Sequence, residues 1–257
     1  MNEIIASRTN KLIINAVKLR EKKYRDASMQ FFFEGRKLFT EALISKVSFS
    51  MVFVTQKCKK LLAKPLDTLG CPIYTVTDSV YEKLSLDSSP DGIFCIASKA
   101  SAHSDKAGSV RFILSSVRDP GNLGTCIRSA RAFAVNELIL HDCADPYNPK
   151  AIRASMGALF RQYFSVTDNI LATISELSKE GCKIYPAALT QDSVPLSRIL
   201  PDRKTVFVVG NEGHGISPEV ISACNMPPVI IPMAGDTESL NASVAASLLM
   251  WEQSKIL

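Results

Sequence analysis

Residues 206–215 read Val206-Phe-Val-Val-Gly-Asn-Glu-Gly-His-Gly215, an apolar run that ends in a loop with three glycines. Two other segments share this design, Asp119-Pro-Gly-Asn-Leu-Gly-Thr-Cys-Ile-Arg128 and Ile230-Ile-Pro-Met-Ala-Gly-Asp-Thr-Glu-Ser-Leu-Asn-Ala-Ser243. Glycine lets a backbone approach a ligand closely because it carries no Cβ. We therefore expect the three loops to form one composite pocket.

Around these loops, apolar strand-like runs alternate with helical patterns from residue 111 onward. The expected strands are 111–115, 137–141, 163–166, 183–188, 205–209 and 229–232, and the expected helices begin near 122, 150, 170 and 239. In the last helix, Leu240, Val244, Leu248 and Trp251 recur at helical spacing and predict a buried stripe. This alternation predicts an α/β fold, a parallel sheet with helices on both faces. Ligands of such sheets bind beyond the carboxyl ends of the strands, where all three loops lie.

A smaller α/β unit precedes this one. Strands are expected at 31–35, 47–55, 73–76 and 93–97, with a helix over 37–44. Residues 100–108 are small and polar without periodicity, which is typical of a linker. We therefore predict a first domain over 1–99, a linker over 100–108 and a second domain over 109–257.

Composition limits the class of protein. The chain has 257 residues, 46% hydrophobic and 21% charged, which predicts an ordered globular protein with a sizeable core. It contains neither an apolar run long enough to cross a bilayer nor a signal-peptide pattern, so we expect a cytosolic protein without a membrane partner. The seven cysteines show no regular spacing and are expected to be reduced packing residues.

The charge is unevenly distributed. Residues 1–64 hold 14 Lys and Arg against 5 Asp and Glu, whereas the rest of the chain holds 16 against 20. The densest part, Lys18-Leu-Arg-Glu-Lys-Lys-Tyr-Arg25, ends a segment with helical apolar spacing, and it predicts an amphipathic helix with a cationic outer face. Such a face is often simply solvated, but the asymmetry along the chain favours a polyanion such as RNA as partner.

The loops contain several candidate site residues. Arg128 points away from the apolar face of its helix, where a guanidinium can hold a phosphate. Glu212 lies between glycines, where a carboxylate can bind a hydroxyl or an arginine, and Ser239 precedes a helix that it could cap. Taken singly, Arg128 is also typical of a surface arginine, Glu212 of an exposed loop acid, and Ser239 of a helix cap. The glycine order Gly210-x-x-Gly213-x-Gly215 matches neither a dinucleotide site nor a phosphate-binding P-loop, which disfavours a nucleotide-dependent oxidoreductase.

Taken together, the three loops resemble the motifs of the SpoU, or TrmH-type, RNA ribose 2'-O-methyltransferases of the SPOUT superfamily. Asn122 to Arg128 is similar to the first motif, residues 210–215 to the second, and Ile231-Pro-Met with Ser239-Leu-Asn-Ala-Ser243 to the third. The resemblance covers about 110–251. The basic first domain resembles the ribosomal L30-type (L30e-like) substrate-binding domain of some members, mainly through Glu34-Gly35 after a strand.

The resemblance implies a deep trefoil knot, a homodimer with active sites shared between subunits, and S-adenosylmethionine as cofactor with no metal. Its implied cofactor contacts are Gly210, Ile231 and Leu240, with Asn211, Gly213, Met233 and Ser243 as further predicted contacts. Its implied catalytic residues are Arg128, Asn122, Glu212, Ser239 and Asn241.

The implied reaction methylates a ribose 2'-hydroxyl of structured RNA. Arginine is a poor base because its pKa lies above about 12, so we expect Arg128 to hold and polarise an RNA phosphate instead. The separate basic domain favours 23S-type ribosomal RNA. The alternatives are a tRNA ribose 2'-O-methyltransferase and a non-catalytic RNA-binding protein with the same fold.

Overall fold

The computed structural model describes residues 4–99, 110–211, 213, 215–234 and 239–256. By its internal contacts the chain divides into two compact units. One contains Met1–Ser101 and Tyr147–Arg153, and the other contains Ala102–Pro146 and Ala154–Leu257. The predicted linker lies outside the described residues, so the predicted domain boundaries stay a prediction.

The first unit is a four-stranded mixed sheet with helices on its faces. Its elements are α1 (Lys11–Lys18), α2 (Lys22–Ser28), β1 (Gln30–Glu34), α3 (Arg36–Ile44), β2 (Phe49–Thr55), α4 (Gln56–Leu61), α5 (Ala63–Asp67), β3 (Ile73–Val76), α6 (Asp78–Leu84) and β4 (Ile93–Ser98). The strand order is β1-β4-β2-β3, and only β2 and β3 pair in parallel. On one face, apolar residues of α1 and α6 pack against Phe32, Phe53 and Phe94.

The single amphipathic helix expected up to Arg25 is wrong, because the chain bends between α1 and α2. Arg25 is buried rather than part of an outer cationic face, and its guanidinium donates to the carbonyls of Leu19 and Arg20 at the bend, each at 2.8 Å. These bonds satisfy backbone groups that a continuous helix would have used internally.

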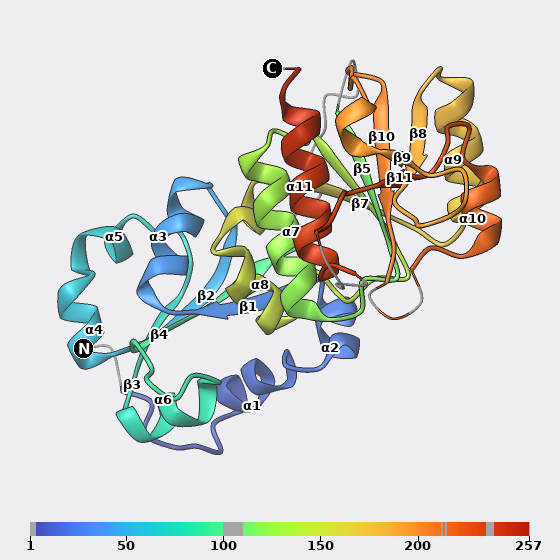
Figure 1. Ribbon diagram of the computed structural model, residues 1–257. Helices are drawn as coiled ribbons and strands as arrows, with labels where there is room; N and C mark the ends of the chain where they lie inside the picture. Colours follow the sequence, from blue (N-terminus) through green and yellow to red (C-terminus); the bar gives the residue numbers. More distant parts are fainter. Residues whose placement is uncertain (1–3, 100–109, 212, 214, 235–238, 257) are drawn as a thin grey trace. The chain divides into compact units, whose positions relative to one another are not determined.

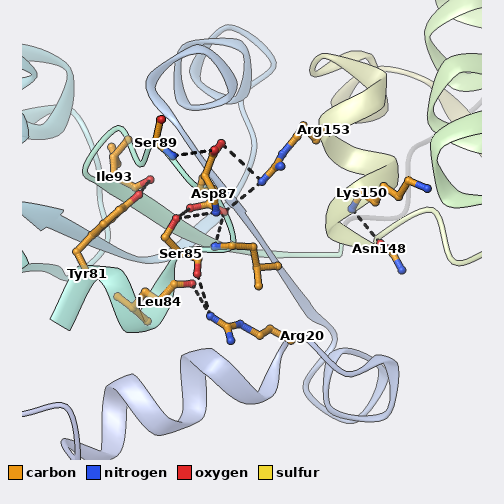
Figure 2. Close-up of polar contacts among 12 residues, drawn as sticks. Arg20, Tyr81, Leu84, Ser85, Asp87, Ser89, Ile93, Asn148, Lys150 and Arg153 are labelled. Carbon is orange, nitrogen blue, oxygen red and sulfur yellow. Dashed lines mark hydrogen bonds and ion pairs between the residues drawn. The ribbon is translucent and has the colours of Figure 1, made fainter. Parts of the chain in front are cut away.

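A heptapeptide from the middle of the chain completes the first unit. Tyr147 packs on the ring of Phe31, with ring centroids 4.8 Å apart. The Lys99 ammonium lies 5.0 Å from the centroid of the Tyr147 ring. Arg153 lies in α8 (Pro149–Ser155), and its Nη2 is 3.5 Å from Glu34 Oε1 and 3.7 Å from Asp87 Oδ2. Figure 2 shows Arg153 pointing toward Asp87, and Arg20 at the carbonyls that end α6.

The second unit is built on a five-stranded, all-parallel sheet of order β7-β6-β5-β10-β8. Its elements are β5 (Arg111–Ser115), α7 (Pro120–Ala132), β6 (Glu137–His141), η1 (Ala158–Phe160), β7 (Tyr163–Thr167), α9 (Ile170–Lys179), β8 (Lys183–Pro186), β9 (Val194–Pro195), η2 (Leu196–Arg198), β10 (Thr205–Val209), α10 (Pro218–Ala223), β11 (Val229–Ile230) and α11 (Ala242–Ser254). Figure 1 shows α7 and α11 on one side of the sheet and α9 and α10 on the other. The predicted α/β fold with both sheet faces covered is confirmed.

Alternate residues of the strands serve the two faces. Ile113, Ile139 and Val208 pack with α9 and α10, whereas their buried neighbours in the strands face the opposite side. One expected strand differs: β11 pairs with β9 in a two-stranded sheet, and a single bridge between Val229 and Ala187 links it to the segment that follows β8. Residues 231–232, expected to continue it, run on as a loop.

The buried stripe predicted for α11 is also wrong. Val244, Leu248 and Trp251 are 46%, 38% and 49% exposed. The helix instead buries Ala246, Leu249, Met250 and their neighbours against the sheet and α7. Because α11 is apolar on most sides, spacing alone does not identify its buried face.

Candidate active site

A pocket of about 710 Å³ opens at the carboxyl ends of β8 and β10. It is lined by Ala187, Ala188, Leu189, Val209, Gly210, Asn211, Gly215, Ile216, Ile221, Val229, Ile230, Ile231, Pro232, Met233, Ser239, Leu240, Ala242 and Ala245. The second and third sequence motifs thus meet in one cavity. It lies beside the point where the chain order of the sheet switches direction between β5 and β10, which is where open α/β sheets bind ligands.

The loop after β10 folds back on itself in a tight turn. Asn211 N donates to Gly215 O at 3.0 Å, and Gly215 N donates to Asn211 O at 2.9 Å. A Cβ on Gly210 would lie 2.3 Å from the Gly215 carbonyl oxygen, and Gly215 has a φ of +65°. Gly210 thus has no room for a side chain, and Gly215 has a conformation that glycine favours, so both bring their backbone close to the cavity that they line.

The Asn211 side chain connects this turn to the end of β5. Its Nδ2 donates to the carbonyl of Ser116 at 2.9 Å, and its Oδ1 accepts from Gly213 N at 2.7 Å. The loops after β5 and β10 are thereby held together at the floor of the site. Asn211 lines the pocket, whereas Gly213 is not among the lining residues.

The starts of α7 and α11 lie side by side next to the pocket. Asn241 caps α11 and also donates from Nδ2 to Asn122 Oδ1 at 3.2 Å. Ser243 Oγ lies 3.3 Å from Asn122 Oδ1 and 2.6 Å from Asn241 Oδ1. Asp119 in turn caps α7 by accepting from Asn122 N at 2.9 Å. These contacts bring three of the predicted residues together, and the cap of α11 is Asn241 rather than Ser239.

Arg128 is exposed on α7, and no hydrogen bond or ion pair joins it to another residue that the structure describes. It lies six residues after Asn122, which places the two side chains about 120° apart around the helix. The structure therefore does not bring Arg128 to the Asn122 and Asn241 cluster within one chain. Glu212 lies outside the described residues.

The remaining predicted cofactor contacts divide clearly. Ile231, Met233 and Leu240 line the pocket together with Ser239, whereas Ser243 lies in the neighbouring polar cluster. The sequence reasoning missed Ala187, Ala188 and Leu189, which follow β8 and form one wall. Their signal was present, because they too follow an apolar run at a strand end.

The chemistry of this pocket fits S-adenosylmethionine. Its walls are mainly aliphatic side chains and backbone, which suit an adenine ring, and its volume is within the usual range for cofactor sites. Among the residues that the structure describes, no group of three or more His, Cys, Asp or Glu is placed to hold a metal ion. Nor is any of the described helices long and apolar enough to span a membrane.

Charged and titratable groups lie at the neighbouring strand ends. Asp142, after β6, accepts from Arg118 at 2.5 Å and from Ser116 at 3.1 Å, and these bonds lower its pKa. Burial raises the pKa of the adjacent Cys143 thiol to about 11, which keeps it protonated at neutral pH. All seven cysteines are free thiols.

The chain belongs to the SpoU rRNA Methylase family, because residues 109–251 match the sequence pattern of that family. Residues 10–95 match the MRM3-like substrate binding domain. The family, the fold class and the enzyme class predicted from the motifs are confirmed.

Individual relatives match at least 95% of the chain. The 23S rRNA (guanosine(2553)-2'-O)-methyltransferase RlmP of Bacillus subtilis (strain 168) is 30% identical over 248 residues, covering 96% of this chain and 97% of its own. An AdoMet-bound rRNA methyltransferase from Sinorhizobium meliloti superposes with a TM-score of 0.86 at 25% identity, covering 99% and 98% of the two chains. A putative RNA methyltransferase of the TrmH family from Porphyromonas gingivalis superposes with a TM-score of 0.81 at 29% identity, covering 95% and 97%.

Proposed function

We propose that this protein transfers a methyl group from S-adenosylmethionine to a ribose 2'-hydroxyl of 23S-type ribosomal RNA. The observation that carries the proposal is the convergence of Gly210, Ile231 and Leu240 on one pocket beside the Asn122 and Asn241 cluster. Ribosomal RNA is favoured over tRNA because the RlmP relative, named for 23S rRNA, matches the basic N-terminal part as well as the methylase part.

The N-terminal unit supplies a cationic surface suited to RNA. Lys11, Lys18, Lys22 and Lys23 are exposed on α1 and α2, and the ammonium groups of Lys18 and Lys23 lie 5.7 and 4.8 Å from the ring centroid of Tyr24. Lysines attract phosphates, and aromatic rings stack on unpaired bases. This surface would bind the substrate without reading most of its sequence.

S-adenosylmethionine supplies a methyl group that its sulfonium has already activated. The protein must align the 2'-hydroxyl with that methyl group and help to remove one proton. Asn122, fixed by Asn241 and Ser243, would position the ribose, while Ser239 and Asn241 shape the pocket. Arg128 would hold the adjacent phosphate and polarise the hydroxyl, and Glu212 would orient Arg128 or the substrate.

A homodimer would bring Arg128 to such a site. Hydrogen bonds from Asn241 to Asn122 and between Ser129 and Ser247 show that α7 and α11 run parallel. Helical geometry then places Arg128 on the same side as the exposed apolar stripe of Val244, Leu248 and Trp251. Exposed apolar side chains gathered on one face of a helix are typical of an interaction site. We infer that this face pairs with a second copy across a two-fold axis, so that Arg128 of one subunit serves the pocket of the other.

One further part of the proposal follows from the family. The chain containing the second and third motifs would be threaded as a deep trefoil knot, as the resemblance to the family implies. The cytosolic location expected from the sequence stays a prediction.

The test is methylation of unmodified RNA by the purified full-length protein with radiolabelled S-adenosylmethionine. Ribosomal RNA and tRNA transcripts are compared, and the product is mapped for 2'-O-methyl nucleotides. We expect one methylated ribose in 23S-type rRNA. Methylation of tRNA alone would replace the substrate class, and RNA binding without methyl transfer or cofactor binding would favour the non-catalytic alternative.

A further inference from the structure

A cation other than Arg128 lies at the rim of the site. Arg118, in the loop between β5 and α7, lines a small cavity of about 20 Å³ with Asn122, Asn211, Ala242 and two neighbours. Asn211 and Ala242 also line the large pocket, so the two cavities are adjacent. Arg118 thus lies on the same chain as the pocket and borders the residue that is proposed to position the ribose.

The Arg118 guanidinium is held in place by two residues at strand ends. Its Nη2 donates to Asp142 Oδ2 at 2.5 Å, and Ser116 Oγ donates to the same oxygen at 3.1 Å. The Asp142 pKa is lowered by these bonds, first by Arg118 and then by Ser116, so the carboxylate stays charged at neutral pH.

Both supporting residues have unusual backbone conformations. Ser116 and Asp142 have φ values of +61° and +49°, in the left-handed region that non-glycine residues seldom adopt. Bonds from Ser116 N to the His141 carbonyl and from Asn211 Nδ2 to the Ser116 carbonyl hold the first of them. Strained backbone persists where surrounding contacts fix it, and it is concentrated at functional sites. Here both residues in that conformation belong to the hydrogen-bonded group around the Arg118 guanidinium.

Most of the Arg118 side chain remains available to a ligand. It is 70% exposed, and within the described part of the chain its only ion pair is with Asp142. A guanidinium carries five N–H donors, so one carboxylate oxygen leaves several of them free. An arginine that is already oriented by one anion can bind a phosphate with its remaining donors at little entropic cost.

We propose that Arg118 binds a backbone phosphate of the RNA next to the target ribose, and that Asp142 and Ser116 act as positioning residues for its guanidinium. This inference rests on the proposed function. Arg118 would act in the chain that holds the cofactor pocket, whereas Arg128 would act from the partner subunit. The two arginines would then hold phosphates on either side of one nucleotide.

The experiment compares Arg118→Gln, Arg118→Lys and Asp142→Asn with the matched control Lys183→Gln. Lys183 also forms an exposed ion pair, with Asp202 at 2.7 Å, but it lies at the opposite, amino end of β8. The full-length proteins are assayed for methylation of 23S-type rRNA, for RNA affinity between 50 and 300 mM salt (roughly the range over which phosphate contacts are resolved), and for calorimetric binding of S-adenosylmethionine.

We expect Arg118→Gln to raise the KM for RNA about tenfold, with kcat at saturating RNA and cofactor affinity little changed. The slope of log affinity against log salt should fall by about one, because one phosphate contact is lost. Arg118→Lys should restore the salt slope and part of the KM. Asp142→Asn should raise KM without changing the slope, and Lys183→Gln should change neither.

Two results would overturn the inference. In one, Arg118→Gln and Lys183→Gln share the KM and the salt slope of the wild type. In the other, Arg118→Gln loses cofactor affinity or thermal stability to the same degree as activity, which would make Arg118 a structural residue. If the wild type methylates no RNA, the proposed function itself fails and this inference falls with it. If the wild type methylates RNA, either of the two results above overturns the role of Arg118 and leaves the proposed function intact.

Discussion

Asn241 Nδ2 donates to Asn122 Oδ1 at 3.2 Å, although the two residues lie 119 positions apart. The same Asn241 side chain caps α11 by accepting from the backbone N–H groups of Ser243 and Val244. One amide therefore fixes the start of a helix and orients the residue proposed to hold the ribose. These two roles use different atoms and can be separated by substitution.

Asn241→Asp should keep the cap and lose the donor to Asn122. Aspartate caps helices as well as asparagine does, so the free energy of unfolding should change by less than about 0.5 kcal/mol. Methyl transfer should fall about 100-fold because the ribose is misplaced. Asn241→Ala, which removes both roles, should also cost about 1 kcal/mol of stability. Denaturant unfolding and single-turnover methylation measure the two effects, and an Asn241→Asp enzyme with full activity would show that the contact is dispensable.

Arg128→Ala should reduce methyl transfer about 1000-fold and leave S-adenosylmethionine binding intact, because it removes charge stabilisation from the reacting group and not from the cofactor pocket. Arg131→Ala is the control, since Arg131 is also exposed on α7. Methylation assays and calorimetry are compared for both variants. An active Arg128→Ala enzyme would remove Arg128 from the mechanism.

Leu248→Glu should convert the proposed dimer to a folded monomer with little activity. Leu248 is already exposed on α11 of the single chain, so its replacement should barely affect the stability of the monomer. Leu200→Glu is the control, because Leu200 is 90% exposed and lies away from α7 and α11 in the sequence. Sedimentation equilibrium gives the mass, and a wild-type protein that sediments as a monomer at micromolar concentration contradicts the proposed interface.

Gly210→Ala should abolish cofactor binding and destabilise the second unit by about 3 kcal/mol, because its Cβ would overlap the Gly215 backbone. Gly70→Ala is the matched control, since a Cβ there meets no atom within 4 Å. Calorimetry and thermal unfolding distinguish the two variants. Mixing Gly210→Ala with Arg128→Ala should restore about a quarter of the wild-type activity if each site combines two subunits, and no recovery is expected if each chain acts alone.

Asp26 should make the first unit sensitive to acid. Hydrogen bonds from Lys22 and Lys99 lower its pKa to about 2 from 3.8. A lowered pKa means that the stabilisation is complete above pH 3.8 and is lost as the pH falls toward 2. Because the carboxylate is half exposed, its contribution is about 1 kcal/mol at most. Thermal unfolding is measured from pH 6 to 2 (roughly spanning both values). The melting temperature should fall less for Asp26→Asn than for the wild type. Equal falls would show that the Asp26 carboxylate does not cause the acid sensitivity.

The strands of the second unit were predictable because each is a short, nearly continuous apolar run, as expected for strands buried on both faces. The pocket was predictable because its loops follow those runs. The buried face of α11 was not, since apolar residues surround that helix and packing against α7 selects among them. The cap of α11 was also ambiguous, because Ser239 and Asn241 are both suitable caps two residues apart.

Other features lie beyond local sequence signals. The contact between Asn122 and Asn241 joins distant segments, and no periodicity reports it. The bend at Arg25 depends on a buried guanidinium that a charge count assigns to the surface. Arg118 was passed over because its significance comes from Asp142, a residue 24 positions further along the chain.

The heptapeptide Tyr147–Arg153 has a consequence for attempts to isolate the N-terminal part. A fragment truncated at residue 99 would expose the Phe31 ring and leave the largely buried Glu34 carboxylate without Arg153. Such a fragment lacks a piece of its own interior, and autonomous folding would require that the missing peptide be supplied in trans or grafted onto the cut end. Shuffling of this module between enzymes is restricted in the same way, because a single crossover after residue 99 cannot transfer it together with Tyr147–Arg153.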